Sequence, residues 1–197
     1  MWNVNPRIRH WYEYSTNFAS EYLGFGNGRS CLVIGSPIFE LNILRGLGWD
    51  ATYMDIRTPP PQAGKHLVMD ATEITLPDES FDAVSSSCVL THAGTGRYGD
   101  SIKEEHGDEM MLDHIHRVMK KGAPAQITFG ACYSGEKMVR LGKAHRIYTV
   151  KECERMLDRS KFKVVEMRVW SFRTKDWTTE ITSDIYKPDY ISFAVSK

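Results

Sequence analysis

The chain has 197 residues, enough for one domain with a substantial hydrophobic core and too few for two domains of ordinary size. Hydrophobic residues make up 42% of it and charged residues 25%, as is usual in globular proteins. Its 25 Lys and Arg residues balance its 25 Asp and Glu residues, so no net charge attracts nucleic acid or an acidic membrane. This balance argues against a nucleic-acid-binding protein.

The cysteines and the apolar runs indicate where the protein resides. Cys31, Cys88, Cys132 and Cys153 are far apart and form no CxxC pair, which favours reduced thiols over a disulfide framework or a zinc site. No apolar run approaches the roughly 18 residues of a membrane span, and the N-terminal residues lack the apolar region of a signal peptide. We therefore expect a soluble, cytoplasmic monomer or homodimer that binds neither a metal nor a membrane.

Hydrophobic spacing predicts an alternation of helices and strands. Helices are expected where apolar residues recur on one helical face, and strands where short apolar runs lie between turn residues. In chain order the sequence predicts helix 6–23, strand 30–35, helix 38–47, strand 51–55, strand 66–70, strand 81–88, helix 105–120, strand 125–130, helix 149–159, strand 163–170 and strand 190–195. Residues 58–64, with three consecutive prolines, predict a loop.

This order of elements predicts an α/β fold. Strands that alternate with helices form a mainly parallel sheet of seven strands with helices on both faces. Residues 1–29 are expected to form an N-terminal helical segment that packs on the main domain, residues 30–197. In parallel sheets ligands bind beyond the carboxyl ends of the strands, and here those ends carry Gly35, Asp55, Asp70 and Ser87. We therefore expect the functional site at that edge.

Two stretches resemble the class I S-adenosylmethionine-dependent methyltransferases. DATEITLPDESFDAVSSSCVLTH (residues 70–92) resembles the third and fourth motifs of that superfamily, and DHIHRVMKKGAPAQITF (residues 113–129) is similar to its following helix, turn and fifth strand. The resemblance covers roughly residues 30–197. It implies a Rossmann-like sheet whose last two strands form an antiparallel hairpin, S-adenosylmethionine as the cofactor, and methyl transfer as the activity.

The first motif of the superfamily is only partly present. Where the superfamily shows an acid and a DxGxGxG turn, this chain has VIGSPIF (residues 33–39), in which only Gly35 matches a glycine. Gly35 can supply the tight turn that brings the backbone close to the methionine part of the cofactor. Pro37 can begin the next helix, whose amino end favours an anionic group.

The resemblance also implies a set of cofactor-binding residues. Asp55 would accept hydrogen bonds from both ribose hydroxyls, and Asp70, with the amide of Ala71, would lie beside the adenine amine. The alternatives are a solvated strand-end acid for Asp55 and a turn-forming residue for Asp70. Ser87 and Cys88 resemble positions that line the methionine end. The complete predicted set is Gly35, Ser36, Pro37, Asp55, Ile56, Asp70, Ala71, Ser87 and Cys88.

GTGRYGD (residues 94–100) and AHRIY (residues 144–148) resemble segments of a narrower, uncharacterised methyltransferase-like family, where they would flank the cofactor pocket. They would bear the substrate-binding residues Arg97, Tyr98, Arg146 and Tyr148. His145 and Asp100 are the candidate general bases, because a neutral imidazole or a carboxylate can take a proton from a hydroxyl or an amine. Alternatively, these side chains order their loops by hydrogen bonds, and His92 is expected to be structural.

The leading hypothesis is an S-adenosylmethionine-dependent methyltransferase that acts on an oxygen or nitrogen nucleophile of a small molecule, such as a sugar or another metabolite. A catalytically degenerate S-adenosylmethionine-binding module that serves a protein partner is the alternative, and the incomplete first motif favours it. An acid after the second strand would also suit a nicotinamide cofactor, but the GxGxxG pattern is missing.

Overall fold

The computed structural model describes residues 6–102, 106–131, 139–140, 146–171, 176–178 and 189–197. The elements in chain order are α1 (Pro6–Leu23), β1 (Ser30–Ile34), α2 (Ile38–Gly46), β2 (Asp50–Asp55), the 3₁₀ turn η1 (Pro61–Ala63), β3 (His66–Val68), β4 (Ala83–Ser87), α3 (Gly107–Val118), β5 (Pro124–Ala131), β6 (Val139–Arg140), β7 (Arg146–Ile147), α4 (Val150–Arg159), β8 (Lys163–Ser171), β9 (Asp176–Thr178) and β10 (Asp189–Ser196). No described helix is both long enough and apolar enough to cross a membrane.

The sheet confirms the predicted fold class. Its strand order is β3-β2-β1-β4-β5-β10-β8-β9. The first five of these strands are parallel, and β10 pairs antiparallel with both β5 and β8. The last two predicted strands are thus the antiparallel pair β8 and β10. Two short pieces lie beyond the prediction: β9 extends the edge of the sheet, and β6 pairs with β7 as a separate ribbon.

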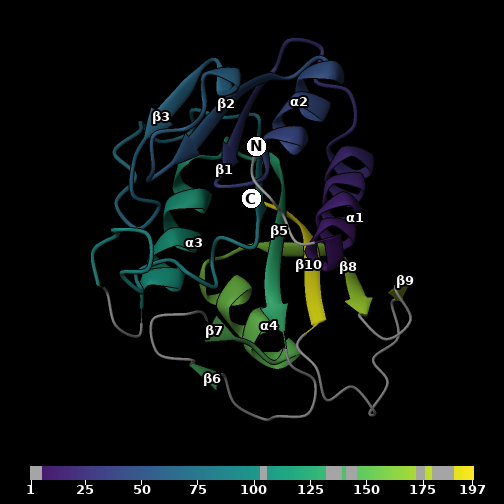
Figure 1. Ribbon diagram of the computed structural model, residues 1–197, viewed down its shortest axis with the longest axis vertical. Helices are drawn as coiled ribbons and strands as arrows, with labels where there is room; N and C mark the ends of the chain where they lie inside the picture. The colour runs from purple at the N-terminus through teal and green to yellow at the C-terminus, as the bar shows by residue number, and fades with distance from the viewer. Residues whose placement is uncertain (1–5, 103–105, 132–138, 141–145, 172–175, 179–188) are drawn as a thin grey trace.

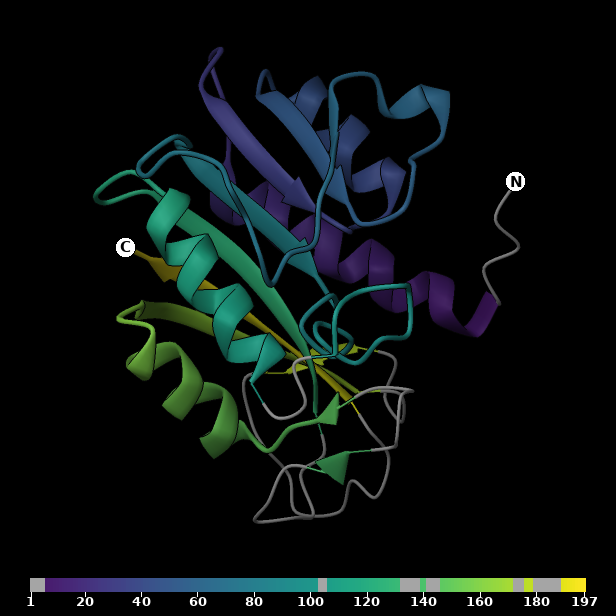
Figure 2. The same ribbon diagram turned by 90° about the vertical axis from the view of Figure 1, so that its left-hand side faces the viewer.

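Helices cover both faces of this sheet (Figure 1), with α1 and α2 on one face and α3 and α4 on the other. The view turned by 90° shows α1 running across the back of the central strands (Figure 2), where it packs against β4, β5 and β10. The larger hydrophobic core joins the sheet to α3 and α4, with Leu32, Ile115 and Ile127 fully buried in it. A separate cluster fills the space beneath α2.

The order of strands fixes where a ligand can bind. β1 pairs with β2 on one side and with β4 on the other, so the chain leaves β1 in one direction and later returns on its opposite side. The connections that follow β1 and β4 therefore diverge and leave a crevice beyond the carboxyl ends of these strands. The Gly35 turn and the end of β4 both open onto this crevice.

Helix α2 differs from its predicted apolar pattern. Its apolar residues Phe39 and Ile43 are 38% and 40% exposed, whereas Glu40 is completely buried. The physical reason is the partner surface, because this side of β4 presents the hydroxyls of Ser85 and Ser87 instead of apolar side chains. A carboxyl group can be buried there because these hydroxyls meet its hydrogen-bonding requirements.

The start of α4 gives a test of local stability. As its sequence predicts, Thr149 caps this helix by accepting a hydrogen bond from the amide of Glu152. We expect Thr149→Ala to lower the free energy of unfolding by about 1 kcal/mol, measured by urea denaturation, and Thr149→Ser to keep most of it. Equal stability of the alanine variant would show that the cap contributes nothing.

Candidate functional site

A cavity of about 450 Å³ opens beyond the carboxyl ends of β1, β2 and β4. Its size lies within the roughly 300–1,000 Å³ that is typical of small-molecule sites. All nine residues of the predicted cofactor-binding set line it: Gly35, Ser36, Pro37, Asp55, Ile56, Asp70, Ala71, Ser87 and Cys88. The structure thus brings together side chains from four strand ends, as the parallel sheet requires. Their contact with a cofactor stays a prediction.

The turn after β1 needs its glycine for two independent reasons. Gly35 has a φ of +55°, a conformation that disfavours side chains. A Cβ at this position would also lie 2.6 Å from a methyl group of Val89, which itself lines the cavity. The turn is held from below by the Gly35 amide, which donates to the Met54 carbonyl over 2.7 Å. One glycine therefore suffices to make the turn that the incomplete motif predicts.

Ser36 and Pro37 connect this turn to α2 and to β4. The Ser36 hydroxyl accepts a hydrogen bond from the Ser87 amide over 3.0 Å, which ties the turn to the end of β4. Pro37 precedes the first turn of α2 and makes no side-chain cap to it. The first helical residues, Ile38 and Phe39, line the cavity. The positive end of the α2 dipole therefore favours an anionic group at this side of the cavity.

Asp55, the predicted ribose acid, lies at the end of β2 and is almost completely buried. Its carboxylate accepts three hydrogen bonds from Arg57, one from the amide (2.9 Å) and two from the guanidinium (3.0 and 2.8 Å), and a fourth from the Tyr53 hydroxyl. Burial alone would raise the pKa of Asp55, but these Arg57 contacts hold it below the usual value. Asp55 is therefore an ionised acceptor whose ligand has to compete with Arg57.

Arg57 was not predicted from the sequence, and it links the two halves of the cavity. Its guanidinium lies 4.7 Å above the ring of Tyr98, a residue of the predicted substrate segment 94–100. The Arg57 side chain is 39% exposed, so water can solvate it if it leaves Asp55. A ligand that takes the Asp55 oxygens would thus also change what packs on Tyr98.

Asp70 has a structural role in addition to its place in the cavity wall. One carboxylate oxygen accepts from both the amide and the hydroxyl of Thr72, each over 2.8 Å, as in a turn-forming aspartate. The other accepts from the amide of Ser101 over 3.2 Å, which ties the end of segment 94–100 to the β3 side of the sheet. This agrees with the turn-forming alternative and leaves Ala71 and Asp70 together at the cavity.

The predicted substrate side of the cavity is aromatic. Tyr98 and His92 both line it and pack edge to face, with ring centroids 5.4 Å apart. Asp100, one of the two candidate bases, also lines it, and its carboxylate oxygens accept hydrogen bonds from the amides of Gly96 and Tyr98. Asp100 therefore orders its own loop, as the alternative interpretation expects. Arg97 packs on the Tyr98 ring at 5.5 Å and is outside the described cavity wall.

Tyr12 of α1 also lines the cavity, and the sequence analysis missed it. Burial, and then the neighbouring Cys88 and Tyr190, raise its pKa, so its hydroxyl stays neutral. Close by, Tyr14 stacks on Trp170 at 4.2 Å between ring centroids. The sequence signal was the aromatic content of residues 12–14, which was interpreted only as a helix face. The N-terminal helix thus supplies one wall of the site.

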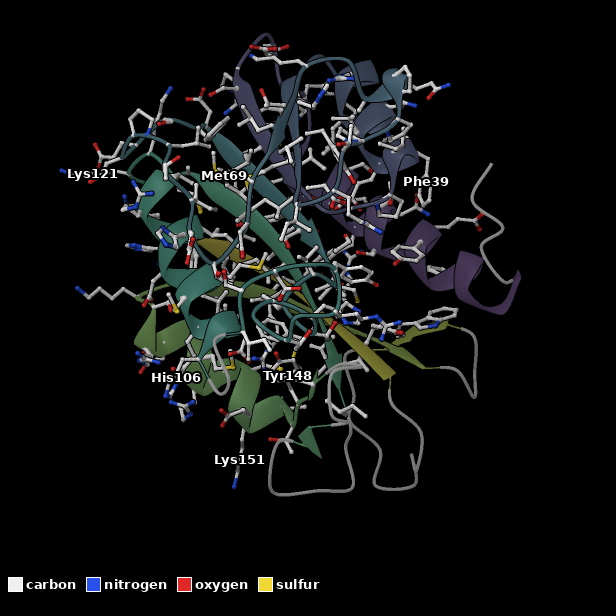
Figure 3. The ribbon with its side chains drawn as sticks, turned by 60° about the vertical axis from the view of Figure 1, so that its left-hand side comes forward. Phe39, Met69, His106, Lys121, Tyr148 and Lys151 are labelled. Carbon is white, nitrogen blue, oxygen red and sulfur yellow. The ribbon has the colours of Figure 1, made fainter. Side chains whose placement is uncertain are left out.

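The structure corrects the predicted role of Arg146 and Tyr148. Both side chains are completely buried and neither belongs to the described cavity wall. Arg146 donates to the Ala93 carbonyl and lies 3.6 Å from Asp108, while the Tyr148 hydroxyl donates to Asp108 over 2.7 Å. Figure 3 shows Tyr148 in the interior, away from Phe39 in the cavity wall. The side chains of these two residues are engaged in buried contacts with Ala93 and Asp108. They therefore stabilise the floor of the cavity instead of contacting a substrate.

His145, the other candidate base, lies outside the described residues. Its neighbour Arg146 is placed, and the Arg146 amide donates to the Thr91 carbonyl over 2.8 Å. Residues 146–148 therefore lie next to the stretch that leads into segment 94–100. No three His, Cys, Asp or Glu side chains come together as possible metal ligands in the described part of the chain.

The comparisons with known proteins agree with this geometry. Residues 23–125, just over half of the chain, match the family model of the methyltransferase domain. No curated protein sequence matches. A Burkholderia thailandensis 1,6-didemethyltoxoflavin-N1-methyltransferase, solved with its substrate and S-adenosylhomocysteine, superposes with a TM-score of 0.73 at 13% identity, over 100% of this chain and 80% of that one.

Two further solved structures share the fold but differ in the reaction that their names describe. The cyclase SpnF superposes with a TM-score of 0.72 at 14% identity, over 100% of this chain and 85% of that one. The geranyl diphosphate C-methyltransferase of Streptomyces coelicolor, in complex with S-adenosyl-L-homocysteine, gives 0.68 at 10% identity, over 96% and 80%. At these identities the likeness defines the fold and not the reaction.

The chain belongs to the methyltransferase domain family, within the class I S-adenosylmethionine-dependent superfamily. The cofactor of this superfamily, and of this chain as a member, is S-adenosylmethionine. The residues fit such a molecule: a glycine turn and a helix amino end lie at one side of the cavity, an ionised acid lies at the end of β2, and the wall between them is mainly apolar. The superfamily, the fold and the cofactor predicted from the sequence are thus confirmed.

Because Asp55 already accepts hydrogen bonds from Arg57, substitutions of these two residues are expected to change ligand affinity differently. Asp55→Ala should weaken S-adenosylhomocysteine binding about 10- to 100-fold, because hydrogen bonds to a carboxylate contribute roughly 1.5–3 kcal/mol. Arg57→Ala should leave the affinity unchanged or raise it several-fold, because it removes the competing guanidinium. Calorimetric titration measures both. An unchanged dissociation constant in Asp55→Ala would exclude Asp55 from the site, and a loss in Arg57→Ala would mean that Arg57 itself holds the ligand.

Proposed function

We propose that the protein transfers the methyl group of S-adenosylmethionine to an oxygen or nitrogen atom of a small molecule. One observation carries the proposal: the nine residues of the cofactor-binding set and the aromatic side chains of the loop after β4 border a single continuous cavity. Such a cavity would hold cofactor and acceptor against each other. Holding two reactants in the right orientation lowers the entropic part of the barrier.

The division of labour follows from the chemistry. The sulfonium of the cofactor supplies an already activated methyl group. The protein then has to orient the acceptor, keep water out and remove a proton where the nucleophile carries one. His92 and Tyr98 would provide a flat apolar contact surface for the acceptor, and Tyr12, neutral and largely buried, would complete the aromatic lining. An acceptor with a flat apolar face and one hydroxyl or amine fits this lining best.

His145 and Asp100 remain the proposed bases. Asp100 borders the cavity but also accepts two backbone hydrogen bonds from its own loop. His145 is the first choice because a side chain with a reference pKa of about 6.5 is largely neutral at physiological pH and can accept a proton. A general base of this kind contributes about 100- to 10,000-fold to the rate.

A binding module that serves a protein partner is the second candidate. The observation that favours it is the carboxylate of Asp55, which already accepts four hydrogen bonds from Arg57 and Tyr53. One measurement separates the two functions. A transferase forms S-adenosylhomocysteine from S-adenosylmethionine in a pool of phenols, amines and sugars, whereas a module binds the cofactor without forming it.

The base assignment is testable once an acceptor has been found. We expect His145→Ala to lower kcat about 100- to 10,000-fold while leaving the affinity for S-adenosylhomocysteine nearly unchanged. His66→Ala is the matched control, because His66 lies on the edge strand β3, outside the cavity wall. Full turnover in His145→Ala would exclude it as the base and leave Asp100. Loss of cofactor binding would make His145 a structural residue.

A further inference from the structure

Glu40 is a completely buried acid next to the cavity, and the fold alone does not explain its burial. It lies in the first turn of α2 and has no exposed surface. Burying a carboxylate without a cationic partner is costly, and such groups are normally paired or protonated. No ion pair to Glu40 occurs in the described part of the chain, where its hydrogen-bond partners are hydroxyls. Glu40 therefore requires a specific account.

Three hydroxyls from two layers surround the carboxyl group. Thr16 of α1 donates to Oε2 over 3.1 Å, and Ser87 of β4 donates to the same oxygen over 2.8 Å. Ser85, two residues earlier on β4, lies 2.8 Å from Oε1. Ser36 is close enough to lower the pKa of Glu40, while its hydroxyl donates to the Ile34 carbonyl over 3.3 Å. Ser36 and Ser87 are themselves cavity-wall residues, so a single hydroxyl separates Glu40 from the methionine side of the cavity.

The hydrogen bonds of Ser85 indicate that Glu40 is protonated. Ser85 has one hydroxyl hydrogen, yet it faces two acceptors, Glu40 Oε1 at 2.8 Å and the side-chain oxygen of Gln126 at 3.1 Å. In the structure the side-chain oxygen of Gln126 faces Ser85, and its amide nitrogen faces Ser15 and Thr128. A proton on Glu40 Oε1 resolves this conflict. Glu40 then donates to Ser85, and Ser85 donates to Gln126.

The electrostatic surroundings agree with a protonated Glu40. Burial raises its pKa, and the hydroxyl hydrogen bonds offset this only in part. The ionisable groups that face it from α1, β1, β2 and the end of β4 are Tyr12, Cys31, Tyr53 and Cys88. Burial raises the pKa of each of these four, so all are neutral near pH 7. Asp55 on β2 is already ionised. Among the protonated groups, Glu40 has the lowest ordinary pKa, so it is the first whose proton an incoming cation displaces.

We propose that Glu40 is a positioning residue that supplies the negative charge for the cationic amino group of the cofactor's methionine part, acting through Ser87 and Ser36. The inference rests on the proposed cofactor binding. When the ammonium group enters, the O–H bond of Glu40 breaks, the proton passes to solvent and the carboxylate stays behind as the counter-charge. β1, which leads into the Gly35 turn, carries no acid that could do this. The amino end of α2 is left for the ligand carboxylate.

The test compares two ligands that both carry an uncharged thioether sulfur and that differ at the methionine end. S-adenosylhomocysteine carries the ammonium and carboxylate groups, and 5′-methylthioadenosine lacks both. We expect Glu40→Gln to weaken S-adenosylhomocysteine binding about tenfold or more, because the ligand ammonium loses its buried counter-charge, and to leave 5′-methylthioadenosine binding unchanged. Because glutamine has the shape and neutrality of a protonated glutamic acid, the melting temperature of the ligand-free protein near pH 7 should stay the same.

Proton release gives a readout that a purely structural role would not change. Calorimetry near pH 7 in buffers of different ionisation enthalpy should show up to one proton released per S-adenosylhomocysteine bound by the wild type and none by Glu40→Gln. Affinity should accordingly rise with pH, up to about tenfold per unit, and level off above the pKa of Glu40 in the ligand-free protein. Thr16→Val is the matched control, because it removes one hydroxyl partner without changing charge and should still release the proton.

Each outcome decides the proposal. Selective loss of S-adenosylhomocysteine binding together with loss of proton release supports it. Equal weakening of both ligands, or an unchanged affinity and proton count in Glu40→Gln, overturns it while cofactor binding itself stands. A wild-type protein that binds S-adenosylhomocysteine without releasing a proton overturns it without any variant. A wild type that binds neither ligand overturns both this inference and the proposed function.

Discussion

The carboxyl group of Glu40 joins three parts of the molecule, and the arrangement around the cavity depends on it. It belongs to α2, accepts a hydrogen bond from α1 through Thr16 and contacts β4 through Ser85 and Ser87. From there Ser15, Gln126, Thr128 and Ser192 carry the hydrogen bonds on to β5 and β10. A polar network of this kind is stable only if every member has its partner. It therefore fixes how α1 and α2 lie on the sheet more precisely than apolar packing would.

The elements of the fold could be predicted because their sequence signals are local. Short apolar runs that end on glycine or aspartate predict β1, β2 and β3. Thr149, followed by Glu152 three residues later, predicts the start of α4. The short pieces β9 and the β6–β7 ribbon were missed, since two or three residues carry no periodicity. The antiparallel pairing of β10 with β8 was implied only by the family resemblance, and the pairing of β10 with β5 was not predicted, because both are long-range contacts.

Site residues that directly follow a strand could be predicted from the sequence. Residues whose role depends on contacts with distant parts of the chain could not. Parallel strands bring their carboxyl ends to one edge, so Gly35, Asp55, Asp70 and Ser87 were found together. Arg146 and Tyr148 were misassigned, because polar residues after a strand look the same whether they face a ligand or a buried aspartate such as Asp108. Glu40 was missed although a signal existed, namely the polar residues at alternate positions of two central strands, which require a polar partner on that face.

The cavity combines two kinds of electrostatic control. At the side proposed for the methionine part of the cofactor, Glu40 is buried and no cationic side chain in the described part of the chain pairs with it, so its charge state is sensitive to a bound cation. At the side proposed for the ribose, Asp55 is held ionised by Arg57, whose side chain is 39% exposed and is solvated by water when it leaves the carboxylate. Displacing Arg57 is therefore inexpensive for a ligand that replaces its hydrogen bonds. Because Arg57 also packs on Tyr98, the state of the ribose side reaches the wall where an acceptor would lie. The end of β2 and the aromatic wall of the cavity are thus connected through one side chain.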